Sequence, residues 1–163
     1  MHWPKSLNNK INFSAKLSGY TTFKIGGRAK YFLQADNLSQ LQDALVFAKN
    51  KDIRVFILGA GSNILASDSG IDGLVIKLSG SNFKGLHFKG SFVDAGSAMK
   101  LNQLILRAKD QGLSGLEFLA GIPGTLGGAL RGNAGAWGES IGELVEEVQV
   151  LDYNGKVKLL NKQ

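Results

Sequence analysis

The chain has 163 residues, a formal charge of +6, 44% hydrophobic residues, 22 glycines and no cysteine. This length suits one domain or two small lobes that share a cleft, and the composition is typical of a globular protein. The lack of cysteine excludes disulfides and thiolate metal sites. No apolar run reaches the ~18 residues of a membrane span, and the first residues contain no apolar signal segment, so we expect a cytoplasmic protein without a membrane partner.

The positive charge favours an anionic partner such as a nucleotide phosphate. The lysines are scattered along the chain, however, and are not clustered with interleaved aromatic residues. Since nucleic-acid binding needs such clusters, we do not expect a nucleic-acid partner. A basic nucleic-acid-binding module without a redox role stays open as an alternative.

The first part of the chain predicts a parallel βαβ unit. Residues 1–18 are a polar lead-in without strong periodicity, and residues 31–35 have strand composition. Apolar residues at steps of three and four predict a helix over 38–50, with Asp36 and Asn37 as candidate caps. The continuously apolar residues 55–58 predict a strand buried on both faces, which completes the unit.

The second part alternates turns with short apolar segments. We expect a strand at 74–78, a hairpin at 87–96 that turns near Lys89-Gly90, a helix that Ser97 caps and Gly112 ends, and a hairpin at 145–160 that turns at Asn154-Gly155. The change from a βαβ unit to hairpins with helices predicts an α+β protein of two lobes, residues 1–73 and 74–163. The first is a small parallel lobe and the second is mainly antiparallel.

The loop Gly59–Leu65 directly follows the predicted strand 55–58. Ligands of parallel sheets bind at the carboxyl ends of the strands, and small residues there allow successive amides to face a phosphate. Ser62 and Asn63 add side-chain donors. Ile64 stands where the dinucleotide fingerprint has its third glycine, and no Gly-Lys-Ser/Thr follows, so neither that fingerprint nor a P-loop is present. A tight structural turn is the alternative.

Glycine and alanine dominate Gly121–Gly138, which has too little side chain to build a core. Such a stretch suits backbone that approaches a flat or phosphorylated ligand closely, while Pro123 stiffens it and Asn133 tolerates unusual backbone angles. A flexible linker is disfavoured because Ile, Leu and Trp occur at intervals. We therefore expect this stretch and the Gly59 loop to face one cleft between the lobes.

The remaining candidates carry weaker signals. Arg131 beside the glycine-rich stretch suits contact with the ligand of that stretch or with a phosphate, and a surface arginine is an equal alternative. His87 has no carboxylate or second histidine at ligand spacing, so no metal site is predicted. Ser62 and Ser140 have no visible histidine base, so no catalytic nucleophile is assigned.

Four stretches together resemble one family, the UDP-N-acetylenolpyruvoylglucosamine reductases (MurB) of peptidoglycan synthesis. They are Thr22–Gly27, Leu58–Leu65, Gly121–Ala129 and Asn133–Gly138, and their order and spacing match from about Gly19 onward. Two positions depart from the family pattern. That pattern usually has Asn where Thr21 or Thr22 stands and Tyr where Trp137 stands, so that here an indole replaces a hydroxyl.

The resemblance implies a two-lobed FAD-binding domain of the vanillyl-alcohol-oxidase (PCMH) type. It implies that the Gly59 loop holds the pyrophosphate and that Gly121–Gly138 lies along the flavin. The cofactor-binding residues that it implies are Leu58, Gly59, Ala60, Gly61, Ser62, Asn63, Ile64, Leu65, Gly121, Ile122, Pro123, Gly124, Thr125, Gly127, Gly128, Ala129, Asn133, Ala134, Gly135, Ala136 and Trp137. In that family NADPH reduces the flavin, which passes hydride to the enolpyruvyl double bond of a UDP-sugar and so forms UDP-N-acetylmuramate.

The catalytic residues of the family have no matching positions here. The family's arginine lies in an aromatic-Tyr-Arg signature beyond Gln163, and its serine and glutamate lie in a third, substrate-binding domain. We therefore expect the FAD-binding portion of such a reductase, whether a fragment, a truncated product or one piece of a split enzyme. It should bind FAD but not complete turnover alone. The FAD domain of another oxidoreductase of the same superfamily is the alternative.

Overall fold

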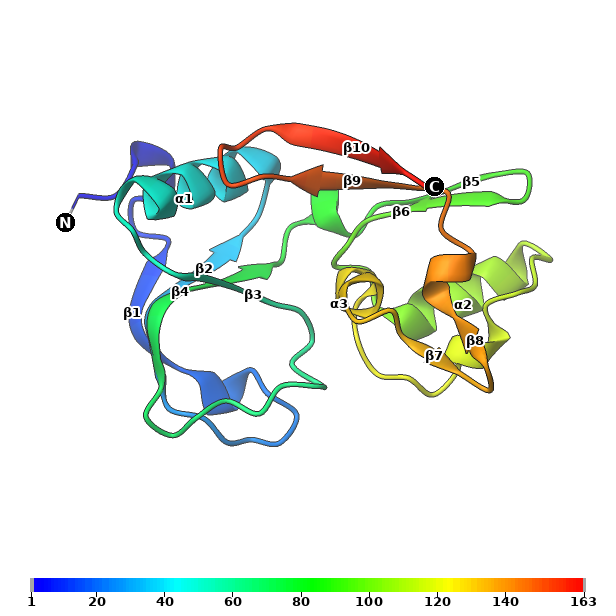
Figure 1. The fold of residues 1–163 in the computed structure, drawn as a ribbon, viewed down its shortest axis with the longest axis horizontal. Coiled ribbons are helices and arrows are strands. Elements are labelled where there is room, and N and C mark those ends of the chain that lie inside the picture. Colours follow the sequence, from blue (N-terminus) through cyan, green and yellow to red (C-terminus); the bar gives the residue numbers. More distant parts are fainter. Residues whose placement is uncertain (1, 163) are drawn as a thin grey trace.

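The computed structural model describes residues 2–162, and these form two lobes (Figure 1). Residues 1 and 163, which begin the first predicted lobe and end the second, lie outside the described part. None of the helices in residues 2–162 is long and apolar enough to cross a membrane.

The first lobe is built on a four-stranded sheet with the order β1-β2-β4-β3. Its elements are β1 (Ile11–Lys16), β2 (Arg28–Ala35), α1 (Leu38–Asn50), β3 (Val55–Leu58) and β4 (Ile71–Leu78), with short 3-10 helices at Lys5–Leu7 and Leu17–Gly19. Strands β2 and β3 both run parallel to β4, and β1 pairs antiparallel with β2. The predicted βαβ unit is therefore confirmed, although β4 lies between its two strands.

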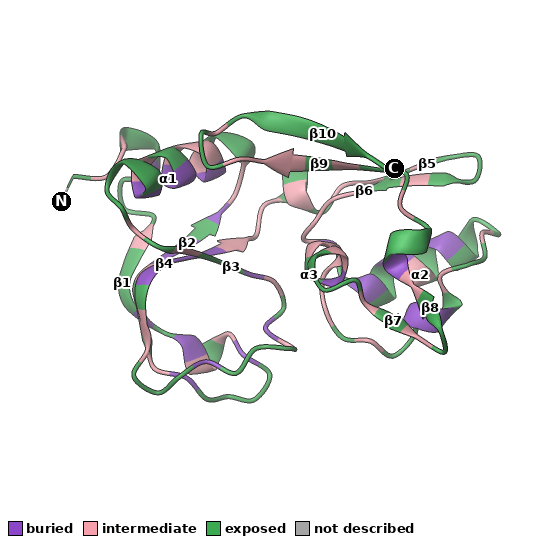
Figure 2. Ribbon diagram, in the orientation of Figure 1, coloured by how far each residue is buried: buried purple, intermediate pink, exposed green. Residues whose placement is uncertain are grey.

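Helix α1 forms where the sequence predicts it. The Asn37 side chain accepts a hydrogen bond from the N–H of Gln40 at 3.0 Å, which caps the first turn. The inward side of the helix buries Leu41, Ala44, Leu45 and Ala48 against the sheet. This apolar stripe explains why the helix lies flat on one face of the sheet (Figure 2).

The polar lead-in contains strand β1, which the prediction did not include. Its residues Ile-Asn-Phe-Ser-Ala-Lys alternate between apolar and polar, which is the pattern of a strand, although only Ala15 is buried. The strand pairs with β2 along the sheet edge, from Ile11 opposite Leu33 to Lys16 opposite Arg28. Its own alternation and its pairing with β2 therefore favour the same conformation.

The prediction that residues 55–58 are buried on both faces is wrong. Phe56 and Ile57 are 40% and 57% exposed, because β3 is the last strand of the sheet and not an inner strand. The inner strands are β2 and β4, where Phe32, Leu33, Leu74 and Ile76 are almost completely buried. An apolar run therefore indicated a strand here but not its place in the sheet.

The second lobe has its own small core under two helices. Its elements are β5 (Leu86–Lys89), β6 (Phe92–Ala95), α2 (Leu101–Asp110), α3 (Leu126–Arg131), β7 (Gly135–Ala136) and β8 (Glu139–Ser140), with 3-10 helices at Ser81–Phe83, Glu117–Leu119 and Ile141–Glu143. The buried residues of this core come from α2, α3 and the two 3-10 helices nearest to them: Leu101, Phe118, Leu119, Ala129 and Ile141.

The expected cap of α2 is wrong, although the helix itself is confirmed. Lys100 occupies the cap position, and no side chain caps the first turn. The Ser97 carbonyl instead accepts the Gly127 N–H at 2.8 Å. Ser97 therefore joins the segment before α2 to the glycine-rich stretch, and its side chain does not cap the helix because α2 begins only at Leu101.

Two features correct the predicted division at residue 73. The boundary falls inside β4, which pairs with both β2 and β3 and so belongs entirely to the first lobe. The hairpin of β9 (Glu147–Leu151) and β10 (Val157–Asn161) also returns to that lobe. Its Gly155 carbonyl accepts a bond from Gln42 of α1 at 2.8 Å, and Leu151 packs on the α1 core.

Candidate functional site

The loop Gly59–Leu65 leaves the carboxyl end of β3 without forming a helix, as predicted. Gly61 holds it in place, with a φ of +72° and a carbonyl that accepts the Thr22 N–H at 2.9 Å. A Cβ at Gly61 would stand 2.1 Å from the Tyr20 carbonyl oxygen, so only glycine permits this approach. The loop is therefore packed closely against the segment before β2.

The main-chain donors of this loop are free within the described chain. No backbone N–H from Gly59 through Leu65 donates to another protein group in residues 2–162. The same is true of the N–H groups of Gly124 and Thr125. Unpaired amides in succession form a concave site suited to an anion. These groups are thus available to solvent or to a ligand.

The two glycine-rich stretches meet, as the sequence predicts. The Ser62 hydroxyl donates to the Pro123 carbonyl at 2.8 Å. A Cβ added to Gly59 would lie 2.7 Å from the Thr125 Oγ1, so the Thr125 side chain lies closer to the Gly59 main chain than any residue with a side chain would allow. We call this contact between Gly59–Leu65 and Gly121–Thr125 the glycine seam.

Backbone hydrogen bonds fix the second side of the seam. The Gly124 carbonyl accepts the Leu101 N–H at 3.2 Å, and the Met99 carbonyl accepts the Leu126 N–H at 2.8 Å. The Thr125 hydroxyl then caps α3 by accepting the Gly128 N–H at 3.3 Å. The seam therefore joins the carboxyl edge of the first sheet to the amino-terminal ends of α2 and α3.

The rest of the glycine-rich stretch continues past the seam through α3 to the β7–β8 hairpin (Figure 1). Strand β7 contacts the 3-10 helix Glu117–Leu119, which precedes Gly121. Asn133 supports that region, since its Oδ1 accepts the Gly142 N–H at 3.0 Å. Trp137 lies in the turn of the hairpin and is 94% exposed. The stretch therefore consists of a seam segment, a helix and a hairpin.

A lysine that the sequence analysis did not single out contacts the loop directly. Lys77 of β4 donates from Nζ to the Gly59 carbonyl at 2.5 Å. Burial, followed by the like charges of Lys84 and Lys100, lowers the pKa of Lys77. Lys77, Lys84 and Lys100 lie apart in the sequence, and the fold brings their charges near one another. The only sequence signal for Lys77 was that a lysine interrupts the apolar residues of β4.

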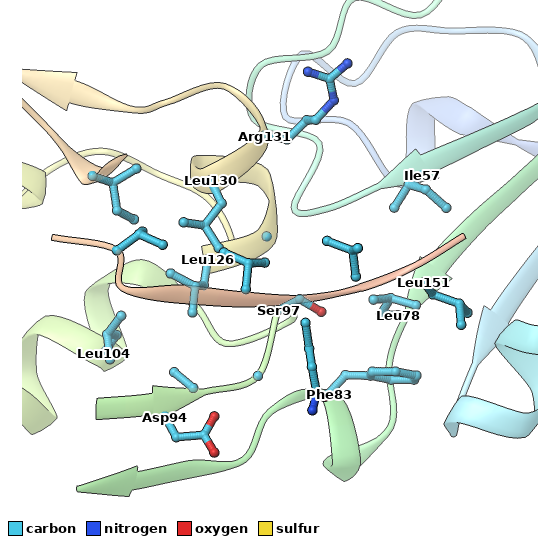
Figure 3. Close-up of a pocket in the computed structure, with 18 of the residues that line it drawn as sticks. Ile57, Leu78, Phe83, Asp94, Ser97, Leu104, Leu126, Leu130, Arg131 and Leu151 are labelled. Carbon is cyan, nitrogen blue, oxygen red and sulfur yellow. The ribbon is translucent and has the colours of Figure 1, made fainter. Parts of the chain in front are cut away.

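A large apolar groove of about 1960 Å³ runs between the lobes beside the seam. Ile57 and Leu78 line it from the first lobe, and Phe83, Leu104, Leu126 and Leu130 line it from the second (Figure 3). This exceeds the ~300–1,000 Å³ typical of a small-molecule pocket. Arg131 extends away from these apolar side chains (Figure 3). The free main-chain N–H groups of Gly59–Leu65 lie at the seam, beside this groove.

The seam has room for a cofactor, but the described residues offer no metal centre. An added Cβ at Gly121, whose φ is +87°, would meet no atom within 4 Å, so open space adjoins the backbone there. Free amides and open space on one side of a glycine backbone fit the diphosphate of a dinucleotide. Across residues 2–162, no group of three His, Asp or Glu side chains is placed to hold a metal ion.

Known proteins resemble this chain in sequence and in fold. The chain is 36% identical to the UDP-N-acetylenolpyruvoylglucosamine reductase of Rhodopirellula baltica over 98% of its own length and 52% of the relative's. The structure of the corresponding reductase (MurB) from Thermus caldophilus matches with a TM-score of 0.74 and 30% identity, covering 93% of this chain and 51% of the other. The chain thus spans about half the length of the curated relatives it matches, and the predicted resemblance is confirmed.

A more distant structure bears on the fold alone. A VAO-type flavoprotein from Myceliophthora thermophila matches with a TM-score of 0.63 at 17% identity, over 82% of this chain and 26% of the other. The predicted α+β fold of this type is therefore confirmed. The model of one domain family, described as FAD binding domain, matches residues 29–161. Since this match covers most of the chain, the protein belongs to the FAD binding domain family.

Proposed function

We propose that the chain binds FAD along the glycine seam, with the cofactor diphosphate held by the free amides of Gly59–Leu65. The observation that carries this proposal is the contact of two glycine-rich main chains from different lobes, joined by the Ser62–Pro123 hydrogen bond. An exposed, unpaired set of N–H groups favours an anion, and the family match supports a flavin dinucleotide.

The flavin itself would extend over the second lobe. Gly121, Ile122, Pro123, Gly124 and Thr125 lie on the seam, and Gly127, Gly128 and Ala129 continue it into α3. Residues Asn133 to Trp137 would contact the cofactor only at an end remote from the diphosphate, since the β7–β8 turn lies across the second lobe. When bound, the flavin supplies the chemistry of hydride transfer. The protein's own groups bind and orient it.

The wider activity follows from the relatives. We propose that the complete protein reduces UDP-N-acetylenolpyruvoylglucosamine with NADPH in peptidoglycan synthesis, and that it works in the cytoplasm, where it supports cell-wall biogenesis and therefore cell shape and division. The relatives are about twice as long, which supports a further domain that binds the UDP-sugar. The FAD domain of a different oxidoreductase is disfavoured because the structures outside the reductase family match at much lower identity.

Titration of the purified chain with FAD tests the cofactor assignment. We expect saturable binding that shifts the flavin absorbance and quenches its fluorescence, with intact FAD released on denaturation. Ser62→Ala should weaken binding by about two- to tenfold, the worth of one hydrogen bond. Ser39→Ala on the exposed face of α1 is the control. A folded chain that leaves FAD absorbance unchanged would refute the proposal.

Turnover tests the assignment of the whole reaction. The isolated chain with bound FAD should not reduce the UDP-sugar when NADPH is added, because the family's catalytic residues have no matching positions in it. Measurement of product by mass spectrometry decides this. Stoichiometric formation of UDP-N-acetylmuramate by the isolated chain would contradict it.

A further inference from the structure

Lys77 is the side chain that controls the first peptide of the seam loop. Its ammonium group donates to the Gly59 carbonyl at 2.5 Å, and it reaches this oxygen from the neighbouring strand, where Lys77 pairs with Leu58. The strand fixes the Cα of Lys77, and the hydrogen bond holds its ammonium group at the Gly59 carbonyl. The contact therefore defines the direction of the Gly59 carbonyl.

The direction of that carbonyl determines the direction of the next amide. The Gly59 carbonyl and the Ala60 N–H belong to one planar trans peptide, in which they point in opposite directions. Without the lysine, a glycine peptide rotates easily and can present its oxygen to a ligand instead. An oxygen at that point would repel a phosphate, whereas an N–H donates to it. The Lys77 contact thus selects the orientation that suits an anion.

The positive charge near the Gly59–Ala60 peptide is not neutralised by an ion pair within residues 2–162. Like charges on Lys84 and Lys100 act on Lys77, and none of the three lysines forms an ion pair with a carboxylate within residues 2–162. Lys100 is also bridged through its backbone to Thr125 on the second side of the seam. Positive charge therefore lies on both sides of the seam, where the ligand would bring negative charge.

We propose that Lys77 is a positioning residue of the seam loop, which orients the Gly59–Ala60 peptide and, with Lys84 and Lys100, supplies the positive charge that selects a dinucleotide diphosphate over an uncharged flavin. This inference rests on the proposed FAD site and adds a source of specificity to its main-chain donors. The ligand group that it recognises is the diphosphate, not the flavin ring.

The test compares FAD with riboflavin, which carries the same ring system without phosphate. We expect Lys77→Met to weaken FAD binding about tenfold or more, the range for a hydrogen bond that involves a charged group, and to change riboflavin binding little. Lys77→Arg, which keeps the charge and the donor, should recover most of the FAD affinity. Lys30→Met removes the same charge from the opposite end of the sheet, where Lys30 pairs with Asp72, and should leave FAD binding unchanged.

The outcomes separate this inference from the proposed function. Wild-type protein that binds FAD while Lys77→Met binds it equally well would overturn the role of Lys77 and leave the FAD site standing. Equal weakening of FAD and riboflavin, or no recovery with arginine, would show a packing role only and would also overturn it. A folded wild-type chain that binds no FAD would remove the proposed function itself. Circular dichroism melting of each variant establishes that it is folded.

Discussion

Gly59→Ala tests whether close main-chain approach holds the seam together. The added Cβ would stand 2.7 Å from the Thr125 Oγ1, well inside van der Waals contact. Thr125 cannot turn away without cost, because its Oγ1 caps α3 through a bond of 3.3 Å to the Gly128 N–H. Overpacking of this kind costs about 1–3 kcal/mol, and loss of the cap accounts for about 1 kcal/mol of it. We expect the free energy of unfolding to fall by that amount.

A double-mutant cycle identifies the atom responsible. Thr125→Ala alone should cost about 1 kcal/mol through the lost cap. In the Thr125→Ala background the clashing atom is gone, so Gly59→Ala should then cost less than about 0.5 kcal/mol. Urea denaturation at neutral pH measures the four free energies, with Gly19→Ala as a control because its added Cβ would meet no atom within 4 Å. Additive costs for the two substitutions would refute the reasoning.

Two further predictions concern a backbone contact and a carboxylate. Gly61→Ala should cost about 3 kcal/mol or more, because it adds a clash with a backbone oxygen to the strain of a positive φ, whereas Gly112→Ala, with a similar φ of +70° and open space around it, should cost only about 1–2 kcal/mol in urea denaturation. The Lys156 N–H, the Lys158 ammonium and the Asn154 N–H lower the pKa of Asp152 from 3.8 to about 2. Its stabilising effect is therefore present above about pH 4 and is lost as the pH falls through 2, so Asp152→Asn should melt earlier than wild type at neutral pH, by a difference that shrinks as the pH falls toward 2. A difference in melting temperature that stays the same from neutral pH to pH 2 would contradict this.

Local elements were predictable where the chain's own pattern decides them. Helix α1 has both its cap at Asn37 and its apolar stripe in sequence, and the β9–β10 turn has its Asn-Gly pair, so both were found. Strand β1 was missed although Ile11, Phe13 and Ala15 alternate with polar residues, because this short signal lies in a polar segment, and its pairing with β2 makes it clear. The burial of β3 was also out of reach, because the insertion of β4 beside β2 leaves β3 at the edge.

The candidate site was likewise predictable from the sequence only in part. Glycine patterns indicated Gly59–Leu65 and Gly121–Thr125, because a close approach of main chains requires residues without side chains. Lys77 was missed, since a lysine inside an apolar strand has no meaning until the strand's neighbour is known. The prediction that Asn133–Trp137 also line the cofactor site stays a prediction: α3 separates them from the seam along the chain, while β7 contacts the 3-10 helix Glu117–Leu119 that precedes Gly121.

The Trp137 side chain strains its turn, and substitutions test whether its ring also contacts the cofactor. It and Gly138 form the two-residue β7–β8 turn with φ values of +60° and +89°, an arrangement that favours Asn-Gly and strains a tryptophan. The ring is 94% exposed, so its replacement loses little burial. Trp137→Asn should therefore raise stability by about 1 kcal/mol, or the melting temperature by about 2–4 °C, while Trp137→Phe should not. A lower FAD affinity in Trp137→Asn but not in Trp137→Phe would show that the aromatic ring contacts the cofactor, and a melting temperature that does not rise would show that the turn carries no strain.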